Sequence, residues 1–283
     1  MKLSEINIRD PFVLPYKSKY YMYGSRVGVP SKEEPWGCQT GFDVYISSDL
    51  EEWSAPKTVF EQTKYFWGTK DFWAPEVYCY KGAFYMLASF KAEGICRGTH
   101  ILVSDEPDGT FVPLSKEPVT PSEWECLDGT LYIDKKGKPH VIFCHEWLQI
   151  GDGTVCEVEL SADLTKVVSE VRTLWKASDF VGVKSVSSRK EAYVTDGPFM
   201  YRTRNGELLC IWSSLLKSGY AQLAAKSDNG DIDGNWTVIQ KPIYAEDGGH
   251  GMLFEDFDGN TRFVMHRPNT VTLERPVFLD INL

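Results

Sequence analysis

The segment "TDGPFMYRTRNGELLCIWSS", residues 195–214, has the pattern of two β-strands joined by a tight turn. An apolar and aromatic run follows Gly197-Pro198, and Arg-Asn-Gly separates it from a second apolar run that ends in two serines. Asn-Gly between two such runs is a strong signal for a β-hairpin. The segment therefore predicts two antiparallel strands, with Asp196 at the point where the first strand begins.

Four other parts of the chain repeat this pattern. They are residues 9–25, 74–89, 127–144 and 249–266. A second signature, a strand ending in Ser-Asp, Ser-Ser-Asp or Ser-Ala-Asp and then a turn, follows four of the five segments, at 44–54, 101–113, 158–168 and 224–238. A two-part unit of about four strands that recurs every roughly 50 to 70 residues is typical of propeller blades. We therefore predict an all-β fold, a five-bladed β-propeller that forms a single domain over residues 1–283.

The alternative fold is a β-sandwich with irregular hairpins, which gives no reason for five repeats of one pattern. The last repeat has a weak outer half and ends in "RPVFLDINL". We therefore expect the terminal segments to close the ring.

The chain is acidic, with 40 Asp and Glu against 30 Lys and Arg and a net charge of −10. A basic face that could neutralise phosphates is not expected, so we predict neither a nucleic-acid nor a membrane partner. No apolar run approaches the length of a membrane span, and the first residues, "MKLSEINIRDPF", contain no apolar leader core. We expect a cytoplasmic protein, unless a leader segment has been removed.

The first strand of a propeller blade lies nearest the central axis, and its start opens on one face of the disc. The residues that we assign to this position in the five repeats are Asp10, Glu76, Asp128, Asp196 and His250. Each acid alone is a common turn or capping residue. Their recurrence in phase with the strands instead predicts an acidic pocket. A metal cage is disfavoured because no Asp-x-Asp-x-Asp-Gly loop is present.

Aromatic residues accompany these carboxylates in the sequence, namely Phe72, Trp73, Trp124, Trp147 and Trp212. Aromatic faces stack on the C–H surfaces of sugars, and carboxylates accept hydrogen bonds from hydroxyl groups. Hydrolysis of a glycosidic bond needs two carboxyl groups in different protonation states. The pattern therefore favours a neutral, polyhydroxylated ligand.

The segments "RDPFVL", "WAPEVYCYKGAFYMLAS", "LDGTLYIDKKGKP", "TDGPFMYRTRNGELLCIWSS" and "GGHGMLF", in this order, resemble glycoside hydrolase family 43 over essentially the whole chain. The resemblance implies a five-bladed propeller that hydrolyses arabinose- or xylose-containing oligosaccharides with inversion. It implies that Asp10 is the general base, and that Asp128 orients the acid and raises its pKa. The general acid of the family is a Glu in a Thr/Ser-Glu-Gly-Pro segment, and here that position is Asp196.

An Asp at the acid position is one methylene shorter than the expected Glu. Three interpretations remain open. Asp196 is the acid, with backbone or substrate shifted to suit; Glu76 or Glu191 has replaced it; or the site binds sugar without cleaving it. We favour the interpretation that Asp196 is the acid, because the other residues of the family site, Asp10, Asp128 and His250, are present.

The remaining site predictions concern substrate and metal. The resemblance implies that Glu76 holds substrate, and we expect Phe72, Trp73 and Trp147 to form sugar-binding walls, with core packing as the alternative. Arg267 is a candidate sugar contact or a structural ion pair. No cofactor is implied for the chemistry, but the resemblance places His250 near a hydrated metal, frequently calcium.

Two other functions remain as alternatives. One is a non-catalytic, carbohydrate-binding propeller. The other is a retaining, invertase-like or fructanase-like glycosidase that uses Glu125 of "SEWECLDG", although such enzymes carry a further C-terminal sandwich. The long segments at 24–41 and 178–193 are expected to form the rim of the pocket, and a closed pocket would favour exo action on short oligosaccharides.

Overall fold

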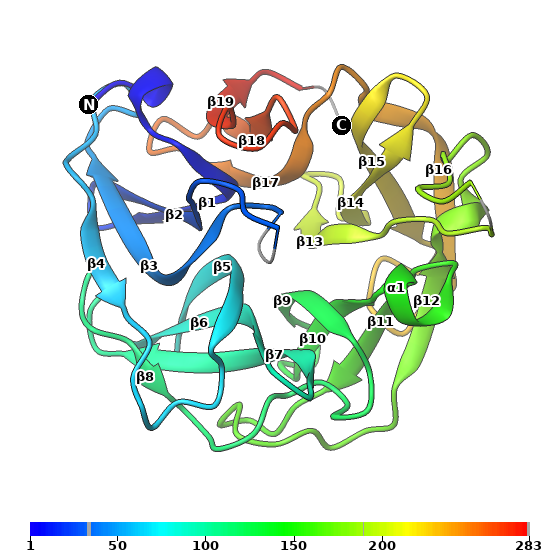
Figure 1. The fold of residues 1–283 in the computed structure, drawn as a ribbon, viewed down its shortest axis with the longest axis horizontal. Coiled ribbons are helices and arrows are strands. Elements are labelled where there is room, and N and C mark those ends of the chain that lie inside the picture. Colours follow the sequence, from blue (N-terminus) through cyan, green and yellow to red (C-terminus); the bar gives the residue numbers. More distant parts are fainter. Residues whose placement is uncertain (33–34, 189, 282–283) are drawn as a thin grey trace.

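The computed structural model describes residues 1–32, 35–188 and 190–281, and its strands form five separate sheets around a central axis (Figure 1). The first sheet contains β1 (Ile8–Tyr16), β2 (Lys19–Val27), β3 (Cys38–Ser47) and β4 (Lys57–Phe60). The second contains β5 (Lys70–Tyr80), β6 (Ala83–Ala92), β7 (Ile95–Ser104) and β8 (Val112–Pro113). Neighbouring strands pair in antiparallel register in both sheets.

The other three sheets follow in sequence order around the ring. The third contains β9 (Cys126–Ile133), β10 (Pro139–His145), β11 (Thr154–Glu159) and β12 (Arg172–Lys176). The fourth contains β13 (Asp196–Arg202), β14 (Leu208–Leu216), β15 (Gly219–Ser227) and β16 (Trp236–Tyr244). The fifth contains β17 (Gly249–Glu255), β18 (Thr261–Arg267) and β19 (Arg275–Leu279). The fold is therefore the predicted five-bladed β-propeller.

Helices are few and short. They are η1 (Leu3–Glu5), α1 (Trp147–Ile150) and η2 (Ala177–Asp179). Within the described ranges, no helix is long and apolar enough to cross a membrane.

The hairpin turns form where the turn chemistry predicts them. In the fourth blade Arg202 pairs with Leu208, and Gly206 between them has a φ of 84°, which a residue with a side chain rarely adopts. The hairpin predicted from residues 195–214 is therefore confirmed.

The terminal segments meet at the junction of the first and fifth blades. Arg9 forms an ion pair with Glu274 at 2.8 Å, and the Nε of Arg275 donates to the carbonyl of Ser4 at 2.9 Å. The described N-terminal residues add no strand to the fifth sheet. The ring is therefore closed by side-chain contacts between terminal segments.

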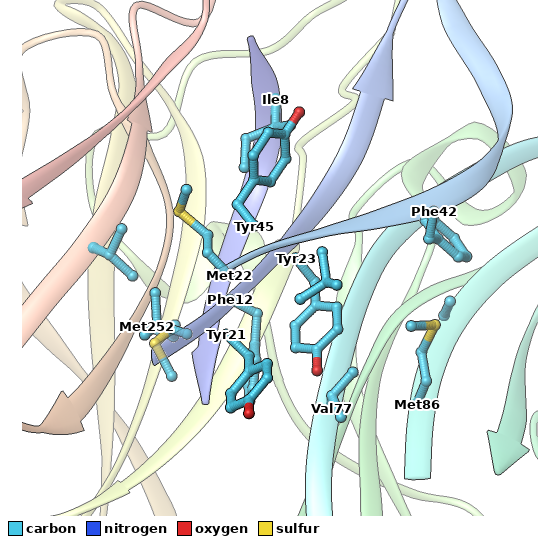
Figure 2. Packing of buried hydrophobic residues seen from close by; sticks show 14 of the residues in the cluster. Ile8, Phe12, Tyr21, Met22, Tyr23, Phe42, Tyr45, Val77, Met86 and Met252 are labelled. Atoms are coloured by element: carbon cyan, nitrogen blue, oxygen red, sulfur yellow. The ribbon is translucent and has the colours of Figure 1, made fainter. Parts of the chain in front are cut away.

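The hydrophobic core fills the spaces between adjacent blades. Figure 2 shows Met22 and Tyr23 of the first blade between Val77 and Met86 of the second blade and Met252 of the fifth. The ring of Phe12, on the innermost strand β1, contacts the rings of Tyr78 and Phe199, with centroids 5.2 and 6.3 Å away. Burying one such side chain contributes about 1.5 to 3 kcal/mol, so this packing holds the inner strands in fixed positions around the axis.

Near the start of every inner strand lies a residue in the left-handed region of φ. These residues are Asp10, Ala74, Asp128, Gly197 and His250, with φ between 48° and 57°. In four blades the backbone N–H of this residue donates to a side chain on the second strand of the preceding blade, namely His266, Ser25, Ser89 or Ser213. A non-glycine residue with positive φ is strained and marks a constrained site. In these four blades a hydrogen bond therefore joins the start of the inner strand to the preceding blade.

This geometry corrects the assignment of equivalent positions. Asp10, Asp128 and His250 are equivalent, but Asp196 precedes the equivalent residue of its blade by one and Glu76 follows that of its blade by two. In the fourth blade the equivalent residue is Gly197. A Cβ there would lie 2.5 Å from Cδ2 of His250, so no side chain fits. The carboxylate of that blade is therefore displaced to residue 196.

Candidate active site

A cavity of about 620 Å³ opens where the inner strands begin, and residues of all five blades line it. Six of the predicted site residues lie on its wall, namely Asp10, Asp128, Asp196, His250, Trp73 and Trp147. The predicted rim contributes Pro35, Trp36 and Val186, while residues 33–34 and 189 of the rim segments lie outside the described residues. The cavity therefore combines the carboxylates, the imidazole and two of the predicted aromatic walls in one place.

Three predicted substrate contacts do not line this cavity. Phe72 is fully buried in the hydrophobic core, where it packs against Phe60 and Phe90, because its side chain points away from the cavity. Arg267 is half exposed, lies over the ring of Tyr244 and faces Glu246 at 3.8 Å. For these two residues the structural alternatives, core packing and an ion pair, replace the predicted sugar contacts.

Glu76 is the third. Its position in β5, two residues beyond the head of the strand, places it beside Tyr78 and Thr130, outside the cavity lining. Burial raises the pKa of Glu76 to about 8, although the hydrogen bond from Tyr78 opposes this. Glu76 is therefore a buried, hydrogen-bonded carboxyl group that does not lie on the cavity wall.

The other carboxylates considered for the acid position also lie elsewhere. Glu191 is exposed and does not line the cavity. Glu125 forms an ion pair with Lys91 at 2.7 Å and accepts the backbone N–H of Arg97 at 2.9 Å. Of the candidate acids, only Asp196 lies on the cavity wall.

Both carboxylate oxygens of Asp10 have close polar neighbours; Ser25 and His250 are donors, whereas Nδ1 of His266 accepts the backbone N–H of Asp10. Oδ2 accepts the hydroxyl of Ser25 at 2.6 Å, and Oδ1 lies 3.0 Å from Nδ1 of His250 and 3.5 Å from Nδ1 of His266. Burial alone would raise the pKa of Asp10, but the charges of His250 and Arg9 hold it well below its usual range. Asp10 is therefore ionised at neutral pH and fixed in orientation.

Asp128 contacts both His250, which pairs with Asp10, and the backbone next to Asp196. Its Oδ2 accepts the backbone N–H of Gly197 at 2.9 Å, and the same oxygen lies 3.8 Å from Nδ1 of His250. Burial raises the pKa of Asp128 against the opposing charge of His250. Because Gly197 directly follows Asp196, the hydrogen bond fixes the backbone that carries the Asp196 side chain.

Asp196 keeps its proton up to near neutral pH, unlike Asp10. Burial is the main cause, and the neighbouring charge of Asp128 adds to it, so that the pKa of Asp196 is raised to about 7. One of its oxygens accepts the hydroxyl of Tyr220 at 3.0 Å. Two carboxyl groups of one cavity, Asp10 and Asp196, thus differ strongly in proton affinity, as acid–base catalysis requires.

Several cavity residues were not predicted from the sequence. Arg97, on the third strand of the second blade, forms ion pairs with Asp71 at 2.8 Å and with Glu146, and its guanidinium stacks 4.0 Å from the ring of Trp73. Glu146, which directly follows β10, also lines the cavity. Nothing in the sequence around Arg97 indicates that its side chain reaches the site.

Further residues of this kind include Arg9, Tyr220 and Asn269. Arg9 donates to Asn269 at 2.8 Å and lies 5.5 Å from the ring centre of Trp36. Arg9 directly precedes Asp10, so strict alternation would place it on the opposite face; the register shift between Arg9 and Phe12 is what lets both residues line the cavity. Tyr220 is on a third strand, and no signal in the sequence indicates its place in the cavity.

His250, the residue expected near a metal, lies between two carboxylates. Burial would lower its pKa, but Asp10 and Asp128 outweigh burial and raise the pKa to about 10, which favours the protonated ring. The described ranges contain no group of three or more His, Cys, Asp or Glu side chains placed to hold a metal ion. We therefore derive no step through calcium.

Comparisons with known proteins agree with this architecture. The family model described as "Glycosyl hydrolases family 43" matches residues 3–281. The crystal structure of an endo-arabinase from Bacteroides thetaiotaomicron VPI-5482 is 39% identical, with a TM-score of 0.91, covering 100% of this chain and 97% of that one. Comparison with curated protein sequences gave no significant match.

Two more distant structures share the fold. A thermostable family-43 glycoside hydrolase is 22% identical, with a TM-score of 0.79 and coverage of 97% of this chain and 89% of that chain. The RS223 beta-xylosidase is 17% identical, with a TM-score of 0.75 and coverage of 99% and 94%. With a family model that spans nearly all of its length, the chain belongs to glycosyl hydrolase family 43.

Proposed function

We propose that this protein is an inverting glycosidase that hydrolyses arabinose-containing oligosaccharides, with Asp10 as general base, Asp196 as general acid and Asp128 as the residue that tunes the acid. One observation carries the proposal. Asp10 and Asp196 line the same cavity, and their surroundings keep the first ionised and raise the pKa of the second to about 7. Inversion needs one carboxylate that can accept a proton from water and one carboxyl group that can give a proton to the leaving oxygen.

In this mechanism Asp10 accepts a proton from a water molecule as the water oxygen attacks the anomeric carbon. The bond from that carbon to the glycosidic oxygen breaks, and Asp196 transfers its proton to the leaving oxygen. The strong pairing of Asp10 with His250 lowers its basicity, so orientation by Ser25 is expected to supply much of the effect. Proton exchange with solvent then restores both groups.

The sugar class is supported by the cavity wall and by the similar endo-arabinase. Trp73 and Trp147 offer aromatic surface, while Asp71 and Glu146 offer acceptors for hydroxyl groups, both held in place by Arg97. Aromatic faces and fixed acceptors suit a neutral sugar. A β-xyloside remains the second pentoside to be tested.

We propose exo action on short chains, because Pro35 and Trp36, from the connection between β2 and β3, lie on the cavity wall. Endo action is the second candidate, favoured by the 39% identity to the endo-arabinase. Product lengths from linear arabinan and from arabinopentaose distinguish the two. Exo action releases one short product from the start, and endo action gives a ladder of lengths.

The test uses aryl α-L-arabinofuranosides, β-D-xylosides and β-D-galactosides together with arabino-oligosaccharides, and the anomer formed first is identified by NMR. We expect inversion, and loss of turnover of unactivated substrates in Asp10→Asn and Asp196→Asn. Glu191→Gln, which neutralises an exposed carboxylate outside the cavity, is the matched control. Retention of configuration would reject the mechanism, and binding without release of sugar would favour the carbohydrate-binding alternative.

A further inference from the structure

Tyr220 makes the one hydrogen bond from a side chain to Asp196 in the described part of the chain. Tyr220 lies on β15, is 2% exposed and lines the cavity. Its hydroxyl donates to Oδ2 of Asp196 at 3.0 Å. A carboxyl group bound in this way on one oxygen has the other oxygen free to carry a proton.

The ring of Tyr220 is held between Gly249 and the ring of His266. On one side it lies so close to Gly249 that a Cβ there would be 2.8 Å from Cε1, and on the other it stacks on the ring of His266, with centroids 5.6 Å apart. Its backbone N–H donates to Asp247 at 3.3 Å, and its carbonyl accepts the N–H of Gly248 at 3.1 Å. The position of the hydroxyl is therefore determined before substrate arrives.

We propose, building on the function proposed above, that Tyr220 is a positioning residue that holds Oδ2 of Asp196 and thereby directs the protonated Oδ1 toward the glycosidic oxygen. Asp196 has two side-chain torsions where the Glu implied by the family resemblance has three, so the direction of its two oxygens depends on the terminal torsion. A fixed donor on Oδ2 sets that torsion. The same hydrogen bond stabilises the carboxylate that remains after the proton has been transferred.

The charges around Asp196 predict the direction of the effect. The titratable groups that face it from neighbouring elements are Asp128, Cys144, Glu146, Tyr220 and His250. Burial raises the pKa of Tyr220 well above its usual value, so its hydroxyl remains a donor at all relevant pH values. That hydrogen bond lowers the pKa of Asp196 against the effects of burial and of Asp128. Removing the hydroxyl should therefore raise the pKa of Asp196.

The experiment compares Tyr220→Phe with Tyr23→Phe. Tyr23 is also buried, and its hydroxyl donates to the carbonyl of Pro107 at 2.6 Å in the core, away from the cavity. Both variants lose one buried hydroxyl, so both should lower the melting temperature. In Tyr220→Phe alone we expect the basic limb of the pH profile of kcat/KM to move up by about one pH unit, since a hydrogen bond to a charged group is at stake.

Leaving groups provide a second readout. For an unactivated arabino-oligosaccharide we expect kcat of Tyr220→Phe to fall roughly tenfold or more, because its leaving oxygen needs a correctly placed proton. For a dinitrophenyl arabinofuranoside, whose leaving group needs no proton, the fall should be much smaller. A pH profile and leaving-group dependence equal to those of Tyr23→Phe would overturn the proposal.

A titration of the Asp196 carboxyl carbon by ¹³C NMR makes the test independent of turnover. A higher midpoint in Tyr220→Phe than in the unsubstituted protein supports the proposal, and an unchanged midpoint contradicts it. If the unsubstituted protein cleaves no substrate of the panel, the proposed function fails on that result alone. The carboxyl titration then still decides whether Tyr220 controls Asp196.

Discussion

Two buried histidines of this protein each lie beside two carboxylates, yet their surroundings differ. His250 faces Asp10 and Asp128, and the three residues come from the fifth, first and third blades. His140 lies between Asp134 and Glu157, and all three belong to the third blade. The first cluster exists only when the ring is closed, whereas the second needs one blade.

The contacts in the two clusters differ accordingly. Nδ1 of His250 approaches Asp10 to 3.0 Å, a hydrogen-bonding distance, and the cluster lines the cavity. The ring nitrogens of His140 lie 3.6 and 3.7 Å from the carboxylates, and neither has a hydrogen-bond partner among the described residues. The cluster between blades therefore has the tighter geometry, and we expect it to carry function, while the cluster within one blade contributes to stability.

The largest expected effect is on turnover when a carboxylate is neutralised in each cluster. Asp10→Asn should lower kcat by roughly 10² to 10⁴-fold, the range for loss of a general base. His250 keeps Asp128 as a partner in this variant, so we expect the protein to remain folded. Glu157→Gln is the matched change in the other cluster and should leave kcat unchanged. Equal losses in the two variants, measured on one arabino-oligosaccharide, would contradict the assignment of function to the His250 cluster.

The next effect is on stability and tests the dependence of the His250 cluster on ring packing. Phe12→Ala removes a ring that contacts Tyr78 of the second blade and Phe199 of the fourth. We expect the free energy of unfolding in urea to fall by about 3 to 5 kcal/mol, as for other buried Phe to Ala changes. The NMR signals of the His250 ring should shift, and those of His140 should not. A shift confined to His140 would reverse the comparison.

These clusters also show what could be predicted from the sequence. The five hairpins are local, since each turn and its two apolar runs lie within about twenty residues, so the blades and their order could be identified. The family resemblance placed Asp10, Asp128, Asp196 and His250, and all four line one cavity. The sequence therefore sufficed for the fold and for three of the five strand heads, Asp10, Asp128 and His250.

The rest depends on contacts between blades, which no local pattern encodes. A register shift at the strand head occurs in all five blades, and in the fourth blade the residue with positive φ is Gly197, where the His250 ring occupies the space of a Cβ. Arg97 and Tyr220 reach the cavity from third strands, where their neighbours have the ordinary alternation of a strand. Phe72 was predicted to line the pocket together with Trp73. Adjacent residues of a strand face opposite sides, so Trp73 lines the cavity and Phe72 is buried in the core.

A smaller effect concerns the pH dependence of turnover, which depends on the His250 cluster and Asp196 together. The base must be ionised, and the pKa of Asp10 lies well below its usual range, so no loss is expected at mildly acidic pH. The acid must be protonated, and the pKa of Asp196 is raised to about 7. We therefore expect kcat/KM for an unactivated oligosaccharide to fall about tenfold per pH unit above that value. Activity that stays constant up to pH 9 would exclude Asp196 as the acid.

The smallest effect belongs to His140 and concerns stability alone. Burial disfavours its charged form, but the carboxylates of Glu157 and Asp134 outweigh burial and raise the pKa of His140 in the folded protein. A group whose folded pKa is raised contributes stability that is fully present below its unfolded pKa, about 6.5. That contribution is lost as the pH rises through the folded value. His140→Gln should therefore cost more free energy of unfolding at pH 5.5 than at pH 9, while kcat stays unchanged at both. A cost that is the same at both pH values would show that the imidazole of His140 is neutral in the folded protein, and that the two clusters differ in charge as well as in place.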